Sequence, residues 1–183
     1  KYKDFNGIIP LIAKNYDGYK NIIKLSSKSY LENSETTSPH CKLDDLINNS
    51  DGIIVLSGSI RCLFGSLFNK GLFNEIEEIL TKLKEKFKDN IYIEIQRHDD
   101  LNEKDFENYN LNISKKLELP IIASNEVYYL NKDMFEAHDA LMCIGEKTYV
   151  NDSSRIKLTN QHYFKSSDEM IELFNDLPEA LEN

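Results

Sequence analysis

The chain has 183 residues, of which 40% are hydrophobic and 29% charged, and its formal net charge is −9. This length suits one sizeable hydrophobic core, and the composition is that of an ordinary globular domain. The acidic balance argues against a domain that grips nucleic acid by its phosphates, because such domains carry clustered lysine and arginine.

The first part of the chain predicts an edge strand followed by helices. Residues 8–13 are mostly apolar and predict a strand, and Pro10 confines it to an edge or a bulge because proline cannot donate to a strand ladder. The next predicted elements are a turn, a helix, an exposed loop and a short helix, over residues 15–18, 19–30, 32–41 and 42–47.

The organising stretch of the sequence is the run from Ile53 to Leu56, four apolar residues rich in β-branched side chains. Gly52 precedes this run and Gly58 follows it, which favours a strand buried on both faces over a buried helix. In α/β folds the chemistry lies just past the carboxyl end of such a strand. Here that position holds Ser57, Gly58 and Ser59.

The rest of the chain alternates between helices and strands. The spacing predicts a helix over 61–69 and a clearly amphipathic helix over 72–87, then strands over 91–96 and 120–123. Further helices are expected after a cap at Asn102, over 132–144 with Gly145 as the stop, and after a capping box of Ser166 and Glu169. The alternation predicts an α/β fold of parallel βαβ units, either a barrel or an open doubly wound sheet.

The cysteines and the apolar runs indicate in which cellular compartment the protein is expected. Cys41, Cys62 and Cys143 are far apart and form no C-x-x-C motif, which argues against a disulfide framework or structural zinc and favours a reducing cytoplasm. No apolar run approaches membrane-spanning length, so no membrane partner is expected. The start at Lys1, without a signal peptide, indicates a piece of a longer cytoplasmic chain.

One pair of residues offers metal-binding chemistry in its local sequence. Glu94 lies in a predicted strand and His98 follows it, so a carboxylate and an imidazole could together bind a divalent metal. The alternative is an ordinary loop leading to the next helix. His162 has no acidic neighbour in sequence and is given no role, and Ser59 lacks the G-x-S-x-G context of a nucleophile elbow.

Five stretches in this order and spacing resemble one family. They are Gly18–Asn21 with Lys24–Ser29, Gly52–Gly58, Tyr92–His98, Leu119–Tyr129 and Glu136–Leu141. Together with the Asp168–Leu181 ending they are similar to the N-terminal PHP (polymerase and histidinol phosphatase) domain of bacterial DNA polymerase III alpha subunits. The resemblance covers essentially the whole chain.

The resemblance implies a fold and a place in a longer protein. It implies the later part of a distorted (β/α) barrel of PHP type, with residues 1–183 as the C-terminal part of that domain. The family's early strands, with an H-x-H motif and further ligands, are expected upstream of Lys1. The polymerase core is expected downstream of Asn183.

The resemblance also implies where metal ligands belong, and this sequence departs at four of those positions. Ile8 stands where the family has histidine, Ser59 where it has cysteine, Glu126 where it has aspartate and Tyr128 where it has histidine. Isoleucine cannot ligate a metal, and serine and tyrosine are poor ligands for borderline metals. Glutamate could ligate, but its extra methylene displaces the carboxylate.

The implied function is therefore a non-catalytic segment of an enzyme. The parent chain would be a DNA-directed DNA polymerase that uses Mg and contacts the DNA. This segment, with no cofactor of its own, would support the polymerase core and dock a proofreading exonuclease subunit. The alternative is a metal-dependent phosphoesterase or proofreading nuclease whose altered site holds Mn or Zn through Glu94 and His98, with Glu126 as a further ligand.

Overall fold

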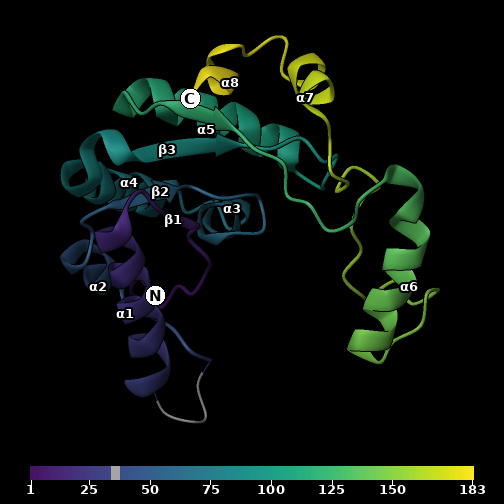
Figure 1. Ribbon diagram of the computed structural model, residues 1–183, viewed down its shortest axis with the longest axis horizontal. Coiled ribbons are helices and arrows are strands. Elements are labelled where there is room, and N and C mark those ends of the chain that lie inside the picture. The colour runs from purple at the N-terminus through teal and green to yellow at the C-terminus, as the bar shows by residue number, and fades with distance from the viewer. Residues whose placement is uncertain (34–37) are drawn as a thin grey trace.

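A four-stranded sheet forms the centre of the molecule in the computed structural model, which describes residues 1–33 and 38–183 (Figure 1). The strands lie in sequence order and are β1 (Leu11–Ala13), β2 (Ile53–Leu56), β3 (Ile91–Ile95) and β4 (Ile121–Ala123). β2, β3 and β4 pair in parallel, which confirms the predicted βαβ units. The predicted edge position of the first strand is also confirmed.

Helices occupy most of the connections between the strands. They are α1 (Tyr16–Leu31), α2 (Leu43–Asn48), α3 (Leu63–Asn69), α4 (Phe73–Phe87), α5 (Glu103–Leu117), α6 (Phe135–Glu146), α7 (Ser167–Leu173) and α8 (Glu179–Glu182). Two 3₁₀ turns, η1 (Lys88–Asn90) and η2 (Lys132–Met134), precede β3 and α6. Part of the predicted loop over 32–41 lies outside the described residues.

The core forms between the sheet and the helices packed around it, among them α3, α4 and α5 and also α1, α2 and α8. The predicted amphipathic face of α4 is buried through Ile76, Ile79, Leu80, Leu83 and Phe87. Val55 of β2 and Ile93 of β3 are fully buried in the same cluster. Burial of such side chains contributes roughly 1.5–3 kcal/mol each, so this cluster fixes the three parallel strands and the loops at their ends.

Four local predictions were wrong. β1 runs antiparallel to β2, because hydrophobic pattern predicts a strand but not its direction. Asn15 caps α1 by accepting the Gly18 N–H at 2.9 Å, so a helix stands where a turn was predicted. Asn102 makes no capping bond with its side chain, which donates to Asn69 instead. Helix α6 continues through Gly145 and stops at Lys147, whose φ is 56°.

The sheet is open rather than closed on itself. Within the described residues β1 pairs only with β2, and β4 only with β3. Ile12 in the edge strand β1 remains 47% exposed. The structure therefore establishes a mixed α/β fold with an open sheet, and a barrel is not formed by these four strands.

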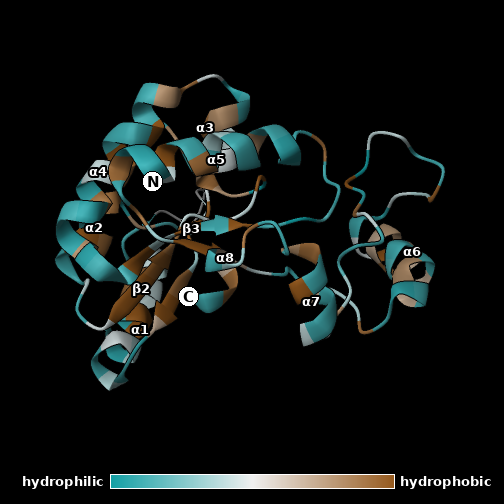
Figure 2. Cartoon of the chain, turned by 90° about the horizontal axis from the view of Figure 1, so that it is seen from above, coloured by the Kyte–Doolittle hydropathy of each residue, from teal (hydrophilic) through white to brown (hydrophobic). Residues whose placement is uncertain are grey.

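Helix α6 stands apart from the sheet in both views (Figures 1 and 2). The two segments that lead to and from this helix are joined by a parallel bridge between Tyr129 and Tyr163. Within residues 1–33 and 38–183, no helix combines the length and apolar character needed to cross a membrane.

Candidate functional site

The candidate site lies where the three parallel strands end. Parallel strands present their carboxyl ends at one edge of a sheet, so the residues after β2, β3 and β4 meet there. The Glu94 N–H of β3 donates to the Ser57 hydroxyl at 2.9 Å, which joins two of these strand ends. The Ser124 hydroxyl, just after β4, donates to the Glu94 carboxylate and joins the third.

The segment after β2 is a tight, buried turn. Gly58 has φ of 84°, and a Cβ there would lie 2.6 Å from Cβ of Cys62, so glycine is required. Ser59 is buried, accepts the Arg61 N–H at 3.3 Å and lies 3.6 Å from Sγ of Cys62. Burial raises the pKa of the Cys62 thiol, which favours its protonated form.

Glu94 is buried at the end of β3, and among the described residues only one of its two carboxylate oxygens accepts hydrogen bonds. Its Oε1 accepts hydrogen bonds from the Gln96 amide at 2.8 Å and from the Ser124 hydroxyl. Its Oε2 is buried without a hydrogen-bond partner among the described residues. An unpaired buried carboxylate oxygen is costly, and it marks this edge as a place that could accept a cation or a donor.

Glu126 and Tyr128, two of the four substituted ligand positions, bond to each other. The Tyr128 hydroxyl donates to Oε1 of Glu126 at 2.8 Å, and Oε2 of Glu126 is buried without a partner among the described residues. Burial and this carboxylate raise the pKa of Tyr128, so its phenol stays protonated. The tyrosine therefore acts as a hydrogen-bond donor to the carboxylate.

His98 is almost completely buried, with both ring nitrogens facing protein groups. Nδ1 lies 3.4 Å from Oε1 of Glu103, while Nε2 lies 3.0 Å from Oδ1 of Asn125 and 3.1 Å from the Glu126 nitrogen. The ring stacks on His162 with a centroid separation of 4.1 Å. These contacts leave neither nitrogen of His98 open to a further ligand.

His162, which was given no role from the sequence, lies at this edge of the sheet and has an acidic neighbour in space. It is fully buried, and its Nε2 lies 3.6 Å from Oδ2 of Asp100. Asp100 is 62 residues away in sequence, so no local pattern could reveal this contact. The stack of two imidazoles ties the segment before α7 to the end of β3.

Arg61 brings a permanent positive charge to the same edge. Its guanidinium donates to Oδ1 of Asp100 at 2.5 Å and lies 3.4 Å from Nε2 of His162. Burial opposes ionisation of Asp100, but His162 and Arg61 outweigh it and lower the pKa of that carboxyl. Sequence reasoning missed Arg61, although its place two residues after Ser59 was a usable signal.

Ile8, the fourth substituted position, lies at the rim of this edge. Its carbonyl oxygen accepts the Leu63 N–H at 2.9 Å, which holds residues 8–10 beside the turn after β2. The residue is 67% exposed. All four positions therefore lie around one edge of the sheet, and Ile8 offers no ligand there.

The described residues do not by themselves fit a metal ion. The Oε2 atoms of Glu94 and Glu126 are suitable hard donors, but both ring nitrogens of His98 are engaged by protein groups. No group of three or more histidine, cysteine or acidic side chains in residues 1–33 and 38–183 has metal-binding geometry. Whether Glu94 and His98 ligate a metal once further chain is present stays a prediction.

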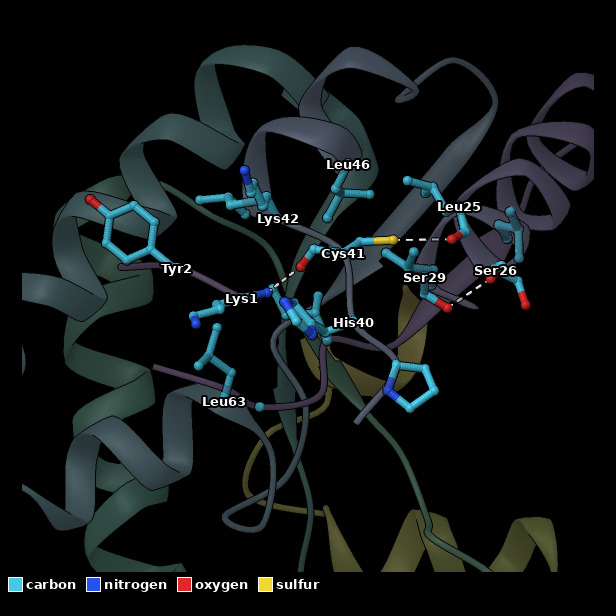
Figure 3. A pocket seen from close by; sticks show the side chains of 16 residues that line it. Lys1, Tyr2, Leu25, Ser26, Ser29, His40, Cys41, Lys42, Leu46 and Leu63 are labelled. Carbon is cyan, nitrogen blue, oxygen red and sulfur yellow. Dashed lines mark hydrogen bonds between the residues drawn. The ribbon is translucent and has the colours of Figure 1, made fainter. Parts of the chain in front are cut away.

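A separate hollow of about 340 Å³ lies between β1, α1 and α2 (Figure 3). It is lined by Leu25, Leu46 and Leu63 and by the Cys41 thiol, which donates to the Leu25 carbonyl at 3.0 Å. Burial raises the pKa of Cys41, which keeps the thiol protonated. The lining is mostly apolar and the hollow lies beside the open edge of the sheet, which indicates incomplete packing at this edge.

Comparison with known proteins gives a family and a set of relatives. The PHP domain family matches residues 2–98. The DNA polymerase III subunit alpha of Borreliella burgdorferi is 41% identical over 175 residues, which are 94% of this chain and 15% of the relative. The subunits of that name from Rickettsia bellii and Caulobacter vibrioides are 38% and 35% identical over 96% and 94% of this chain. The chain thus spans about 15% of the length of these curated relatives.

Proposed function

Because the chain belongs to the PHP domain family and its relatives are alpha subunits of DNA polymerase III, we propose that it is a segment of such a subunit. The parent chain would carry out template-directed DNA synthesis in the cytoplasm, with Mg at its polymerase centre and the DNA held by its other domains. Residues 1–183 would be the C-terminal part of its PHP domain.

The open sheet supports a barrel completed by other parts of the parent chain. Among the residues that the structure describes, β1 has a strand partner on one side only, and Ile12 of β1 is half exposed. An edge of this kind readily accepts a further strand. Strands upstream of Lys1 in the parent would pair there and close the distorted PHP barrel.

Within the parent, we infer that this segment is a scaffold rather than a catalyst. The observation that carries this proposal is the hydrogen bond from Tyr128 to Glu126 at 2.8 Å. It joins two positions where the resemblance implies metal ligands, and it directs the Tyr128 phenol to a protein carboxylate. The remaining role is mechanical, namely to support the polymerase core and to dock a proofreading exonuclease subunit.

A hydrolysis assay on the complete alpha subunit tests this proposal. The protein is incubated with a generic phosphodiester, bis(p-nitrophenyl) phosphate, and with Mn or Zn. We expect no metal-dependent hydrolysis above a Glu94→Gln, Glu126→Gln variant, together with measurable binding of the purified exonuclease subunit. Hydrolysis that the double variant abolishes would overturn the scaffold role.

One observation favours the alternative, a metal-dependent phosphoesterase or nuclease. Oε2 of Glu94 and Oε2 of Glu126 are buried at one edge of the sheet without hydrogen-bond partners among the described residues. Two buried carboxylate oxygens without donors are costly in free energy. Ligands from upstream strands could complete a site for Mn or Zn around them. In that case His98 would be expected to contribute to metal retention.

Replacement of His98 by alanine distinguishes the scaffold from the metal-dependent nuclease. For a scaffold we expect a loss of about 2–3 kcal/mol in unfolding free energy, because Glu103 and the Glu126 N–H lose a buried partner. The metal content, measured by elemental analysis, should not change. His40→Ala is the control and should cost about 1 kcal/mol or less. A fall in bound metal specific to His98→Ala would support the nuclease instead.

A further inference from the structure

Helix α1 presents a row of aromatic and apolar side chains to solvent, on the side of the molecule away from α6 (Figures 1 and 2). We define the α1 face as Tyr16, Tyr19, Ile23 and Tyr30, which are 73%, 54%, 47% and 70% exposed. At about 100° per residue, these four side chains span roughly 60° of the helix circumference, so they share one face. Single exposed apolar residues are common, but three tyrosines in one row are typical of an interaction surface.

Helix α1 is fixed to the sheet through its opposite side. Gly18 and Leu25 are buried there, and a Cβ at Gly18 would overlap the carbonyl oxygen of Gly52. The side-chain amide of Asn21 donates to the Asp51 carbonyl at 2.9 Å. These contacts lie at the amino end of β2, whereas the candidate site lies at its carboxyl end. The α1 face is therefore a separate surface, and it is held in a defined orientation.

Lysines give the α1 face a positive charge within an acidic segment. Helix α1 carries three lysines and one aspartate, with Lys14 two residues before it, while the whole chain has a net charge of −9. Lys20 follows Tyr16 by four residues and Lys24 follows it by eight, so both lysines lie along one flank of the tyrosine row. Charge complementarity therefore favours a polyanionic partner.

The ion pairs of α1 leave two of its lysines available to such a partner. Lys20 lies 2.7 Å from Asp17, but the two side chains are 54% and 71% exposed, and exposed pairs of this kind are weak. Lys24 is exposed and forms no ion pair with the described residues. Lys28 differs, because Asp45 holds it at 2.8 Å.

We propose that the α1 face binds single-stranded DNA. The rings of Tyr16 and Tyr19 lie 6.3 Å apart at 30° to each other and offer stacking faces for bases, while Lys20 and Lys24 contact the phosphates beside them. The bases of a duplex are already stacked on one another, so a single strand is the better match. The choice of DNA over RNA rests on the proposed function. The contact is additional to those that other domains of the parent make with DNA.

Photocrosslinking of the complete alpha subunit to oligo(dT) substituted with 4-thiothymidine tests the proposal. Crosslinked peptides are mapped by mass spectrometry, so a contact at α1 is distinguished from contacts at the polymerase centre. We expect crosslinks on the peptide that carries Tyr16 and Tyr19, and weaker competition there by duplex DNA than by unlabelled oligo(dT). Crosslinks elsewhere in the subunit but none at α1 would overturn the proposal. Competition at α1 by oligo(U) but not by oligo(dT) would overturn the choice of DNA.

Variants test the stacking and the charge separately. The oligo(dT) concentration that gives half-maximal crosslinking at α1 reports the affinity of this face alone. Tyr16→Leu should raise that concentration roughly five-fold or more, while Tyr16→Phe, which keeps the ring, should leave it near wild type. Lys20→Ala with Lys24→Ala should lower the slope of log affinity against log salt by about 1.4, or about 0.7 for each phosphate contact. Lys147→Ala, an exposed lysine beyond α6, is the control and should change neither value.

Further measurements on the same variants separate this inference from the proposed function. Exonuclease binding and the thermal midpoint should match wild type in Tyr16→Leu and in the double lysine variant, because these side chains are exposed. Loss of exonuclease binding with unchanged crosslinking would assign the α1 face to a protein partner and overturn the DNA contact. Failure of the wild-type subunit to bind the exonuclease would count against the scaffold role alone.

Discussion

Replacement of Arg97 by alanine is expected to lower the free energy of unfolding by about 3–5 kcal/mol, the largest effect of any single change considered. Arg97 donates to both carboxylate oxygens of Glu107, at 2.8 and 3.0 Å, and to Asp176 at 2.7 Å. Its guanidinium also lies 4.7 Å from the ring centroid of Phe174. The side chain therefore ties β3, α5 and the segment after α7 together.

The expected loss of unfolding free energy is large because the Arg97→Ala variant leaves a buried carboxylate without its main partner. The Glu107 side chain is only 4% exposed. Removal of Arg97 therefore leaves this buried carboxylate with Lys104 as its remaining ion-pair partner among the described residues. Chemical unfolding followed by circular dichroism measures the loss. Lys116→Ala removes an exposed ion pair with Glu77 and should cost about 1 kcal/mol or less. A loss for Arg97→Ala no greater than for this control would contradict the account.

The same cluster predicts a pH dependence. Burial alone would raise the pKa of Glu107, but hydrogen bonds from Arg97 and Lys104 outweigh it and lower the pKa of that carboxyl. The Arg97 hydrogen bond likewise lowers the pKa of Asp176. Groups with a depressed pKa stabilise the fold above their unfolded-state values, and this contribution is lost as pH falls through the folded-state pKa. The Arg97→Ala variant should therefore lose less stability than wild type as the pH falls below the ordinary pKa values of Asp and Glu, about 4.

Replacement of Gly65 by alanine is expected to cost about 3 kcal/mol through overpacking. Gly65 lies buried in α3, and a Cβ there would stand 2.1 Å from the carbonyl oxygen of Ile60. That oxygen belongs to the turn that carries Ser59, and backbone atoms of a tight turn cannot move aside easily. The change should therefore disturb the candidate site as well as the core.

The matched control for Gly65→Ala is the next residue of the same helix. Ser66 is half-buried in α3, and alanine there should change stability by about 1 kcal/mol or less because it is a good helix former. Urea unfolding of both variants gives the comparison. Equal stabilities for Gly65→Ala and wild type would mean that α3 and the turn after β2 pack less closely than described.

Patterns within one element were read correctly from the sequence. The apolar run Ile53–Leu56 became β2, the helical spacing between Leu72 and Phe87 became α4, and Ser166 with Glu169 formed the expected capping box. These features depend on residues a few positions apart, where sequence spacing and spatial spacing coincide. Because the alternation of helices and strands predicted parallel strands, the ends of β2, β3 and β4 could also be expected to meet at one edge.

Contacts between distant segments could not be read in this way. The stack of His98 on His162 and the ion pair of Arg61 with Asp100 join residues 64 and 39 positions apart, and no local pattern encodes them. The bond between Tyr128 and Glu126 depends on side-chain direction after a strand has ended, which periodicity does not fix. Strand direction in β1 was likewise set by pairing rather than by composition.

The measurement that tests the central claim most directly is the metal content of the complete alpha subunit, purified without chelator, by elemental analysis for Mn, Zn and Fe. If the residues at Ile8, Ser59, Glu126 and Tyr128 have replaced the ligands of the PHP site, little metal should be retained. We therefore expect far less than one such ion per chain, and no change in a Glu94→Gln, Glu126→Gln variant. A near-stoichiometric ion that this variant loses would contradict the account and would establish a working metal centre at the ends of the parallel strands.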